Sequence, residues 1–193
     1  GLAALIYAPN HVRAKVADGT DVTIEEKTIY PFGEKITFII SLGEVPVNFP
    51  LHFRIPSWCQ QAKVTVNGNE VNRCQGDTIF VLRRDWKNGD RVELELPMKI
   101  ALTNWYENST AVERGPLTYA LKIGEKWDNV INDKDPVRFG TSYFEVHPTT
   151  PWNYGLPDFP EDKIPEMFTI VKKDTMTSYP WSLENAPIEL RIK

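Results

Sequence analysis

Two carboxylates in one short stretch are the first side chains that could do chemistry. Glu107 and Glu113 are six positions apart. Paired acids that hydrolyse a glycosidic bond need carboxyl groups about 5–9.5 Å apart. An extended strand, at about 3.3 Å per residue, would separate these two by about 20 Å. They can meet only if a turn at Asn108-Ser109 folds the chain back; the alternative is that each is solvated or paired with an arginine such as Arg114.

A second pair of acids lies on one face of an expected strand. Glu93 and Glu95 are two positions apart, which is about 6.6 Å along a strand. Val92, Leu94 and Leu96 alternate with them. This pattern favours a solvated outer face with the aliphatic residues turned inward, and not an acid pair that works on a substrate.

Cys59 and Cys74 are the only thiols in the chain. They can form a disulfide if their strands face each other, or they can pack as two separate thiols, and the sequence leaves both readings open. A cysteine nucleophile needs a nearby base, and no histidine is close to either cysteine in sequence. We therefore assign no catalytic residue.

Metal-binding patterns are weak. A zinc site needs about four ligands from Cys, His or carboxylates, whereas two lone cysteines and three dispersed histidines show no such spacing. The acidic stretches "DKDP" (133–136) and "GLPDFPED" (155–162) offer oxygen ligands for calcium without the spacing of an EF-hand. We expect surface loops there and neither a metal nor a cofactor in this chain.

Aromatic side chains suggest a different kind of surface. The chain has six tryptophans, and their default role is packing in a core or at a domain interface. Exposed rings can also stack on sugars. We single out four residues as candidates for contact with a sugar or a neighbouring domain: Trp105, Tyr106, Trp152 and Tyr154.

Composition excludes several classes of protein. Apolar residues make up 41% of the 193 positions, enough for a packed core. The formal net charge of −4 and the scattered Lys and Arg argue against a nucleic-acid partner. No apolar run approaches the roughly 20 residues that span a bilayer. The start, "GLAALIYAP", lacks the basic leader of a signal peptide. The compartment stays unknown.

Period-two alternation dominates the chain and predicts an all-β fold. Turn signals recur at the short spacing of a sandwich, for example at Asn67-Gly68 and Asn88-Gly89. We predict two β-sandwich units of the jelly-roll or Ig-like kind, the second smaller and rich in loops. The first would span 1–106 and the second 107–193, with a seam placed to within about 15 residues. Strands are expected at 10–16, 21–28, 34–42, 49–56, 77–86, 91–96, 143–148, 166–173 and 187–193, with a hairpin at 62–71 and one or two strands at 109–123 broken at Gly115-Pro116.

Both ends of the chain fall inside patterned segments. Leu2 begins within an apolar run, and Lys193 follows the alternating Ile188, Leu190 and Ile192. Natural termini usually trail off in polar residues. We expect the chain to be a piece of a longer protein.

Several segments, in order, resemble one known family. They are "LHFRIPSWC", "VTVNG", "RRDWKNGDRVELELPM", "WYENSTAVERGPLTYALKI", "PWNYGL" and "PIELRIK". Together they resemble the C-terminal β-sandwich region of glycoside hydrolase family 127, formerly a domain of unknown function, whose type activity is β-L-arabinofuranosidase. The stretch from about 124 to 142 matches least.

The resemblance implies an architecture and a division of labour. It implies an N-terminal (α/α)6 barrel with a cysteine nucleophile and a zinc ion, followed by two β-sandwich domains. This chain has no adjacent Cys-Cys pair, and Cys59 in "PSWC" does not match the catalytic motif. No catalytic or zinc residue of the family can be carried onto these positions, and zinc is expected only in the barrel.

The expected function is therefore accessory. The fragment would brace the barrel of a bacterial hydrolase, or shape its pocket or a contact of a homodimer. Gly115-Pro116 would set a bend, Trp105 and Tyr106 would fill the seam between the units, and the first sandwich would expose an apolar patch of more than a few hundred Å². The alternative is a carbohydrate-binding module with its own aromatic platform.

Overall fold

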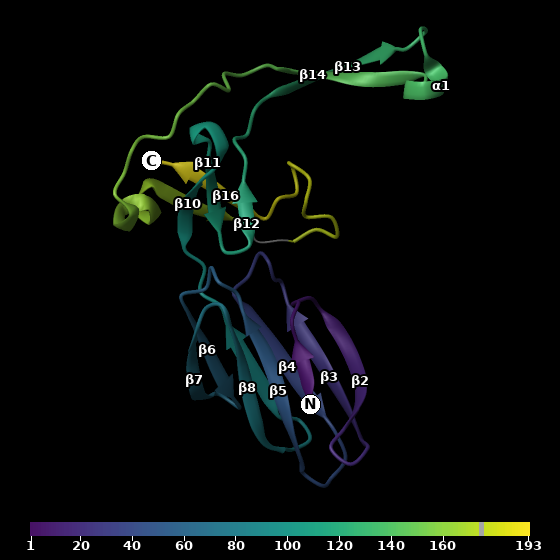
Figure 1. Cartoon of the computed structure of the whole chain (residues 1–193), viewed down its shortest axis with the longest axis vertical. Helices are drawn as coiled ribbons and strands as arrows, with labels where there is room; N and C mark the ends of the chain where they lie inside the picture. The colour runs from purple at the N-terminus through teal and green to yellow at the C-terminus, as the bar shows by residue number, and fades with distance from the viewer. Residues whose placement is uncertain (174–175) are drawn as a thin grey trace.

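A computed structural model describes residues 1–173 and 176–193 of the chain. The described residues form sixteen strands and three short helical turns, so the all-β prediction is confirmed. Figure 1 shows a sandwich formed by the N-terminal half, with a smaller group of sheets and a projecting hairpin beyond it.

Nine strands form the two sheets of the sandwich. The first sheet has the order β1-β5-β8 and the second β2-β3-β4-β9-β6-β7. All neighbours are antiparallel except β1 and β5, which run parallel. Their bounds are β1 (Leu2–Ala4), β2 (Asn10–Val16), β3 (Thr20–Thr28), β4 (Lys35–Ser41), β5 (Val47–Ile55), β6 (Gln61–Val66), β7 (Asn69–Gln75), β8 (Thr78–Trp86) and β9 (Arg91–Glu95).

The alternation read from the sequence sorts residues between core and surface. In β5, Phe49, Leu51 and Phe53 are buried between the sheets, whereas Arg54 is exposed. Trp86 is fully buried at the end of β8 and donates its indole N–H to the carbonyl oxygen of Phe49 at 2.9 Å. A buried indole needs such an acceptor, so this hydrogen bond fixes the β5–β8 pairing from inside the core.

The Asn-Gly turn between β6 and β7 has the backbone that its sequence predicts. Asn67 and Gly68 have φ of 50° and 82°, the left-handed values of a two-residue hairpin turn. The Asn67 side chain also donates to Asp90 at 2.8 Å and accepts from the backbone N–H of Arg91 at 2.9 Å. The turn thus links the β6–β7 hairpin to the start of β9.

The second group of sheets is smaller. One sheet has the order β10-β11-β12 and another pairs β15 with β16. A small core joins them: Ile100, Ile164, Met167 and Phe168 are buried, with Leu102, Val112 and Leu190 packed against them. The bounds are β10 (Ile100–Asn104), η1 (Tyr106–Asn108), β11 (Thr110–Arg114), β12 (Leu117–Tyr119), η2 (Glu161–Met167), β15 (Phe168–Lys172) and β16 (Ile188–Ile192).

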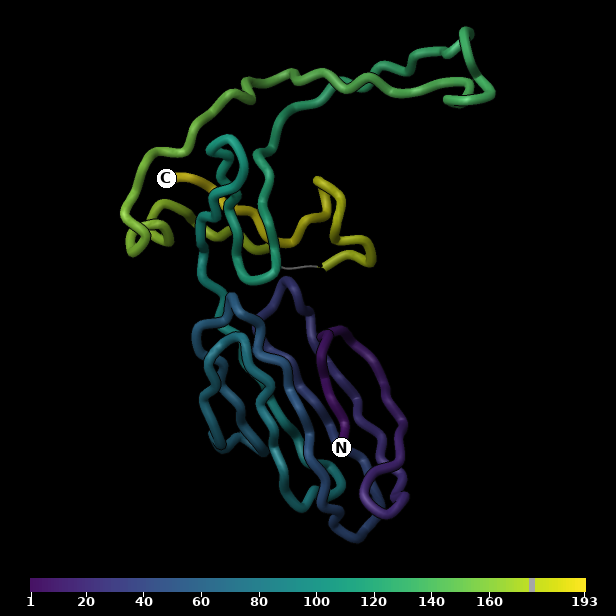
Figure 2. Tube along the Cα trace, in the orientation of Figure 1, coloured from purple at the N-terminus to yellow at the C-terminus, as the bar shows by residue number. Residues whose placement is uncertain are grey.

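A hairpin formed by β13 (Glu125–Ile131) and β14 (Ser142–Pro148), with α1 (Pro136–Phe139) at its tip, stands apart from both groups. Figure 2 traces the chain out along this arm and back. The sequence analysis places no strand between residues 124 and 142, so β13 is a strand that it missed. Four charged or amide residues, Glu125, Lys126, Asp128 and Asn129, obscure its alternation.

The predicted domain boundary falls within a hairpin. Residues 106 and 107 lie in η1, between the paired strands β10 and β11. The division into two domains stays a prediction. If domains follow sheets, we propose that the seam lies between Glu95, the last residue of β9, and Ile100, the first of β10.

Candidate functional site

The two carboxylates of the opening stretch do not share a site. Glu107 lies in η1 at the end of the β10–β11 hairpin and has a left-handed φ of 54°. Glu113 lies on β11 opposite Ala101, three residues beyond the Thr110–Asn104 pair that ends the ladder. Three strand residues span about 10 Å, so the turn leaves the acids apart.

Arg114 has a different partner from the neighbouring acids considered in the sequence analysis. Its guanidinium is almost fully buried and donates to the carboxylate of Glu34, just before β4 of the sandwich. It also contacts the sulfur of Met98 at 3.3 Å. A buried arginine requires a charge partner, but 80 positions separate this pair in sequence, so no local pattern points to it.

The pair belongs to a junction between the sandwich and the smaller sheets. Lys99 donates to the side chain of Gln60. Phe32 packs against Trp181 with ring centroids 4.9 Å apart. The backbone carbonyl and carboxylate of Glu34 also accept from the N–H groups of Leu96 and Met98, at 2.8 and 3.3 Å.

The bend at Gly115-Pro116 sits at the same junction, between β11 and β12. Gly115 has a φ of 60°, and a Cβ atom at this position would lie 2.6 Å from Cγ of Met98. Only glycine meets both conditions. The bend therefore lets the β11–β12 hairpin pack closely on Met98 and positions Arg114 beside Glu34.

Glu93 and Glu95 behave as surface residues. Glu93 accepts from Arg91 at 2.6 Å and lies 3.5 Å from the ammonium group of Lys35. The hydrogen bond from Arg91 holds the pKa of Glu93 below its ordinary value. The residues between and beside the acids, Val92 and Leu94, are fully buried. The outer-face interpretation is confirmed for this strand.

Both cysteines are free and buried. Cys59 lies just before β6, and Cys74 pairs with Ala62 across the β6–β7 ladder. Burial raises the pKa of each thiol. A raised thiol pKa disfavours the thiolate that a nucleophile needs, so the structure places these residues with the packed core.

Among residues 1–173 and 176–193, no group of three or more His, Cys, Asp or Glu side chains is arranged to hold a metal ion. In "DKDP", Asp135 caps α1 by accepting from the backbone N–H of Arg138 at 3.1 Å. In the same described range, no helix is long and apolar enough to cross a membrane.

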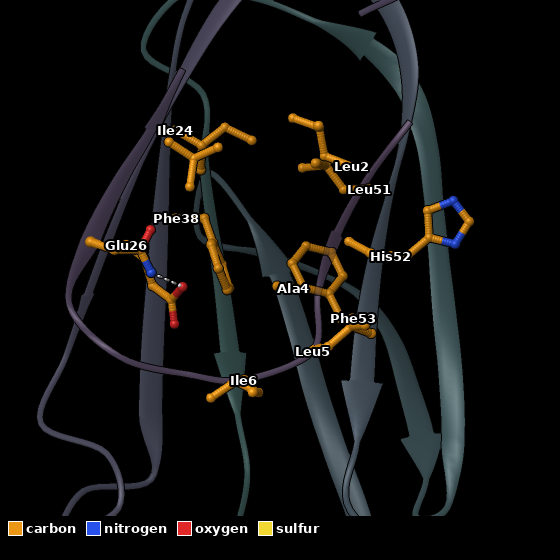
Figure 3. Close-up of a pocket in the computed structure, with 13 residues that line it drawn as sticks. Leu2, Ala4, Leu5, Ile6, Ile24, Glu26, Phe38, Leu51, His52 and Phe53 are labelled. Atoms are coloured by element: carbon orange, nitrogen blue, oxygen red, sulfur yellow. Dashed lines mark hydrogen bonds between the residues drawn. The ribbon is translucent and has the colours of Figure 1, made fainter. Parts of the chain in front are cut away.

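An apolar hollow of about 360 Å³ opens at one edge of the sandwich. Its walls include Leu2, Leu51, Ile24 and Phe38 from strands of both sheets. Figure 3 shows Glu26 at one side of this hollow, beside the ring of Phe38. The sequence analysis did not identify the hollow.

Glu26 is the one acid of this hollow, and it is 5% exposed. Its carboxylate accepts from Nδ2 of Asn10 at 2.8 Å and from the backbone N–H of Ala8 at 3.1 Å. Desolvation nevertheless raises the pKa of Glu26. Its period-two relation to Val22 and Ile24 was the signal that could have identified an inward-facing acid.

The four aromatic candidates are all on the surface. Trp105, Tyr106, Trp152 and Tyr154 are 66, 84, 60 and 68% exposed. Trp105 and Tyr106 lie at the end of the β10–β11 hairpin, away from the sandwich (Figure 1). The expectation that these two fill the seam is therefore wrong, because the hairpin turns its tip outward. A contact with sugar or another domain stays a prediction for all four.

A family model gives the clearest comparison with known proteins. It is described as "Beta-L-arabinofuranosidase, GH127 middle domain" and matches residues 1–98, just over half of the chain. These residues hold both sheets of the sandwich. Among curated proteins, none matches the chain.

Solved structures share the fold. A GH127 beta-L-arabinofuranosidase from Geobacillus stearothermophilus T6 is 24% identical, with a TM-score of 0.56 over 82% of this chain. A glycoside hydrolase is 24% identical, with a TM-score of 0.57 over 82%. A GH127 beta-arabinofuranosidase is 22% identical, with a TM-score of 0.53 over 76%.

The chain covers 28, 30 and 28% of those three proteins, respectively. It therefore spans less than a third of their length, and the likeness at these identities concerns the fold. The family is shown by the match over residues 1–98, and the chain belongs to glycoside hydrolase family 127, with its N-terminal sandwich corresponding to the middle domain.

Proposed function

We propose that this chain is a non-catalytic part of a longer glycoside hydrolase and that it braces the catalytic domain of that polypeptide. The match of residues 1–98 to a middle domain carries the proposal. The matched solved proteins are more than three times as long as the part this chain covers. A middle domain in a chain of that length has neighbours on the same polypeptide.

The roles of the ionisable residues support an accessory function. Arg114 and Glu34 join the two groups of sheets, and Glu93 is held by Arg91 and Lys35. Cys59 is buried as a thiol with a raised pKa. Of the side chains that suggested acid or thiol chemistry, Glu93 is thus engaged in pairing and Cys59 in packing, whereas Glu107 and Glu113 lie apart from each other.

The outer face of the sheet β1-β5-β8 offers one surface for such bracing. Ile79 and Val81 on β8 are 58 and 47% exposed, opposite Arg54 and His52 of β5. Exposed apolar residues beside polar ones are typical of an interface between domains. The full extent of the patch stays a prediction.

The bracing role can be tested by removing this chain from the longer polypeptide. Without it, we expect the catalytic domain to lose activity on heating at a temperature lower by about 2–8 °C, since the loss of about one or two kcal/mol shifts the unfolding temperature of a domain of about 150–250 residues by that much. If the polypeptides with and without this chain lose activity at the same temperature and aggregate to the same extent, the bracing role is contradicted.

A second candidate function is sugar binding. The observation in its favour is that Trp105, Tyr106, Trp152 and Tyr154 are each at least 60% exposed. Calorimetry of the 193-residue chain with arabinose-containing oligosaccharides would show heat that disappears in a Trp152→Ala variant. The absence of heat at millimolar sugar would remove this candidate.

A further inference from the structure

The β13–β14 arm has two chemically different faces. Directly paired residues of an antiparallel hairpin share a face. One face therefore carries four apolar side chains, Trp127, Ile131, Phe144 and Val146, together with the polar Glu125, Asn129 and Ser142. Trp127 and Phe144 pack edge to face with ring centroids 5.9 Å apart. These four side chains are called the apolar arm face below.

The opposite face carries charged residues that pair with one another, and beyond them the cross-strand pair Val130 and Tyr143. Lys126 pairs with Asp128 at 2.9 Å, and His147 lies 3.9 Å from Asp128 and 3.7 Å from Glu145. Charged groups that already have partners gain little from a protein surface. The apolar arm face, with four exposed apolar side chains, would gain more from being covered than the opposite face, where Tyr143 is the exposed ring.

The apolar arm face is bare in the described residues. Trp127, Ile131, Phe144 and Val146 are 59, 64, 59 and 47% exposed. A two-stranded hairpin is marginally stable in water unless a hydrophobic face packs on something. Figure 1 shows the arm extending away from both groups of sheets. The arm thus presents four exposed apolar side chains on one face of the hairpin.

The size of the face decides between two occupants. Each strand has seven residues, about 23 Å at 3.3 Å per residue, and two strands are about 10 Å wide. The footprint is then about 230 Å² in projection, and even about twice that value as accessible surface is well below the roughly 800 Å² that each partner buries in a stable interface between separate proteins. A second copy docked through the arm alone would not stay bound. A domain tethered on the same polypeptide would, because tethering supplies an effective concentration of about millimolar.

We propose that the apolar arm face docks on the catalytic domain of the same polypeptide, so that the arm is the strap by which the smaller sheets hold that domain. This inference rests on the proposed function and names the element that makes the contact. The matched solved proteins, of which this chain covers 28 to 30%, have ample chain to supply that domain.

Amide hydrogen exchange measured by mass spectrometry tests the docking. The natural longer polypeptide and the 193-residue chain are compared peptide by peptide at two protein concentrations. We expect amides of residues 125–148 to exchange at least about tenfold more slowly in the longer polypeptide, equally at both concentrations. Protection that grows with concentration in the 193-residue chain would mean that a second copy covers the face and would overturn the proposal. Equal exchange in the two proteins would also overturn it.

Two neighbouring variants make the test specific to one face. Phe144→Ser removes a ring from the apolar arm face, and Tyr143→Ser removes a ring from the opposite face of the same strand. Both weaken the hairpin itself, so each is measured in both proteins. Phe144→Ser should abolish the added protection of the longer polypeptide, and Tyr143→Ser should leave it. An equal loss of the added protection in the Phe144→Ser and Tyr143→Ser variants would contradict the docking.

The outcome for residues 1–98 separates this inference from the proposed function. If those residues gain protection in the longer polypeptide and the arm does not, the bracing role stands and the strap is wrong. If neither gains protection, both fail.

Discussion

Arg114 of β11 donates to Glu34 across the junction, and this pair joins the smaller sheets to the sandwich. The two partners are unequal. The Arg114 side chain is 3% exposed, whereas that of Glu34 is 33% exposed. Removing one partner should therefore have a different consequence from removing the other.

Glu34→Leu should be the more damaging change, because it leaves a buried guanidinium without a charge partner. We expect it to lower the free energy of unfolding by about 3 kcal/mol. Arg114→Met leaves a carboxylate that water can reach, and we expect about 1–2 kcal/mol. Urea unfolding of both variants and of the double variant measures the coupling. A double variant as unstable as the sum of the two would show that the ion pair contributes nothing.

Gly115→Ala tests the close packing at the bend. The new Cβ would meet Met98 at 2.6 Å with a backbone φ of 60°. We expect a loss of about 2–3 kcal/mol, from left-handed strain and overpacking together. Gly19→Ala is the matched control, because Gly19 has a φ of 94° and nothing within 4 Å of a Cβ. Thermal unfolding should show a smaller loss for Gly19→Ala; equal losses would mean that Met98 moves aside freely.

Glu26 should make stability depend on pH in an unusual direction. Burial raises its pKa in the folded protein, so the folded state binds the proton more tightly than the unfolded chain. Stability from this group is then fully present at pH below its unfolded pKa and is lost as the pH rises through the folded pKa.

Glu26→Gln removes that dependence while keeping the shape of the side chain. The variant loses an acceptor for Asn10 or Ala8, so it should be less stable than the natural chain at pH 4. The difference should shrink toward pH 7, where the natural chain bears the cost of a buried carboxylate. Urea unfolding at the two pH values gives the comparison, and a difference that widens toward pH 7 would refute the assignment.

Local pattern was enough to predict the sandwich. The alternation in β5 and the Asn67-Gly68 turn carry the information for strand and hairpin within a few residues. The expected strand at 49–56 and the observed Val47–Ile55 overlap almost fully. Inward residues such as Phe49, Leu51 and Phe53 followed directly from their period of two.

Long-range partners could not be predicted in the same way. Arg114 was compared with acids near it in sequence, but its partner is Glu34, which topology brings to it. β1 was missed because it has only three residues, and β10 and β13 because their alternation is weak: in β10 only Ile100 and Leu102 are large aliphatic residues. The exposure of Trp105 and Tyr106 depends on which way the hairpin tip points, and a single sequence does not fix that direction.

Hydrolysis of an aryl arabinofuranoside tests the central claim most directly. The 193-residue chain and the natural longer polypeptide are assayed side by side at equal molar concentration. The account predicts turnover by the longer polypeptide and none by the 193-residue chain above the uncatalysed rate. Turnover by the 193-residue chain that disappears in Cys59→Ala or Glu107→Gln would contradict it.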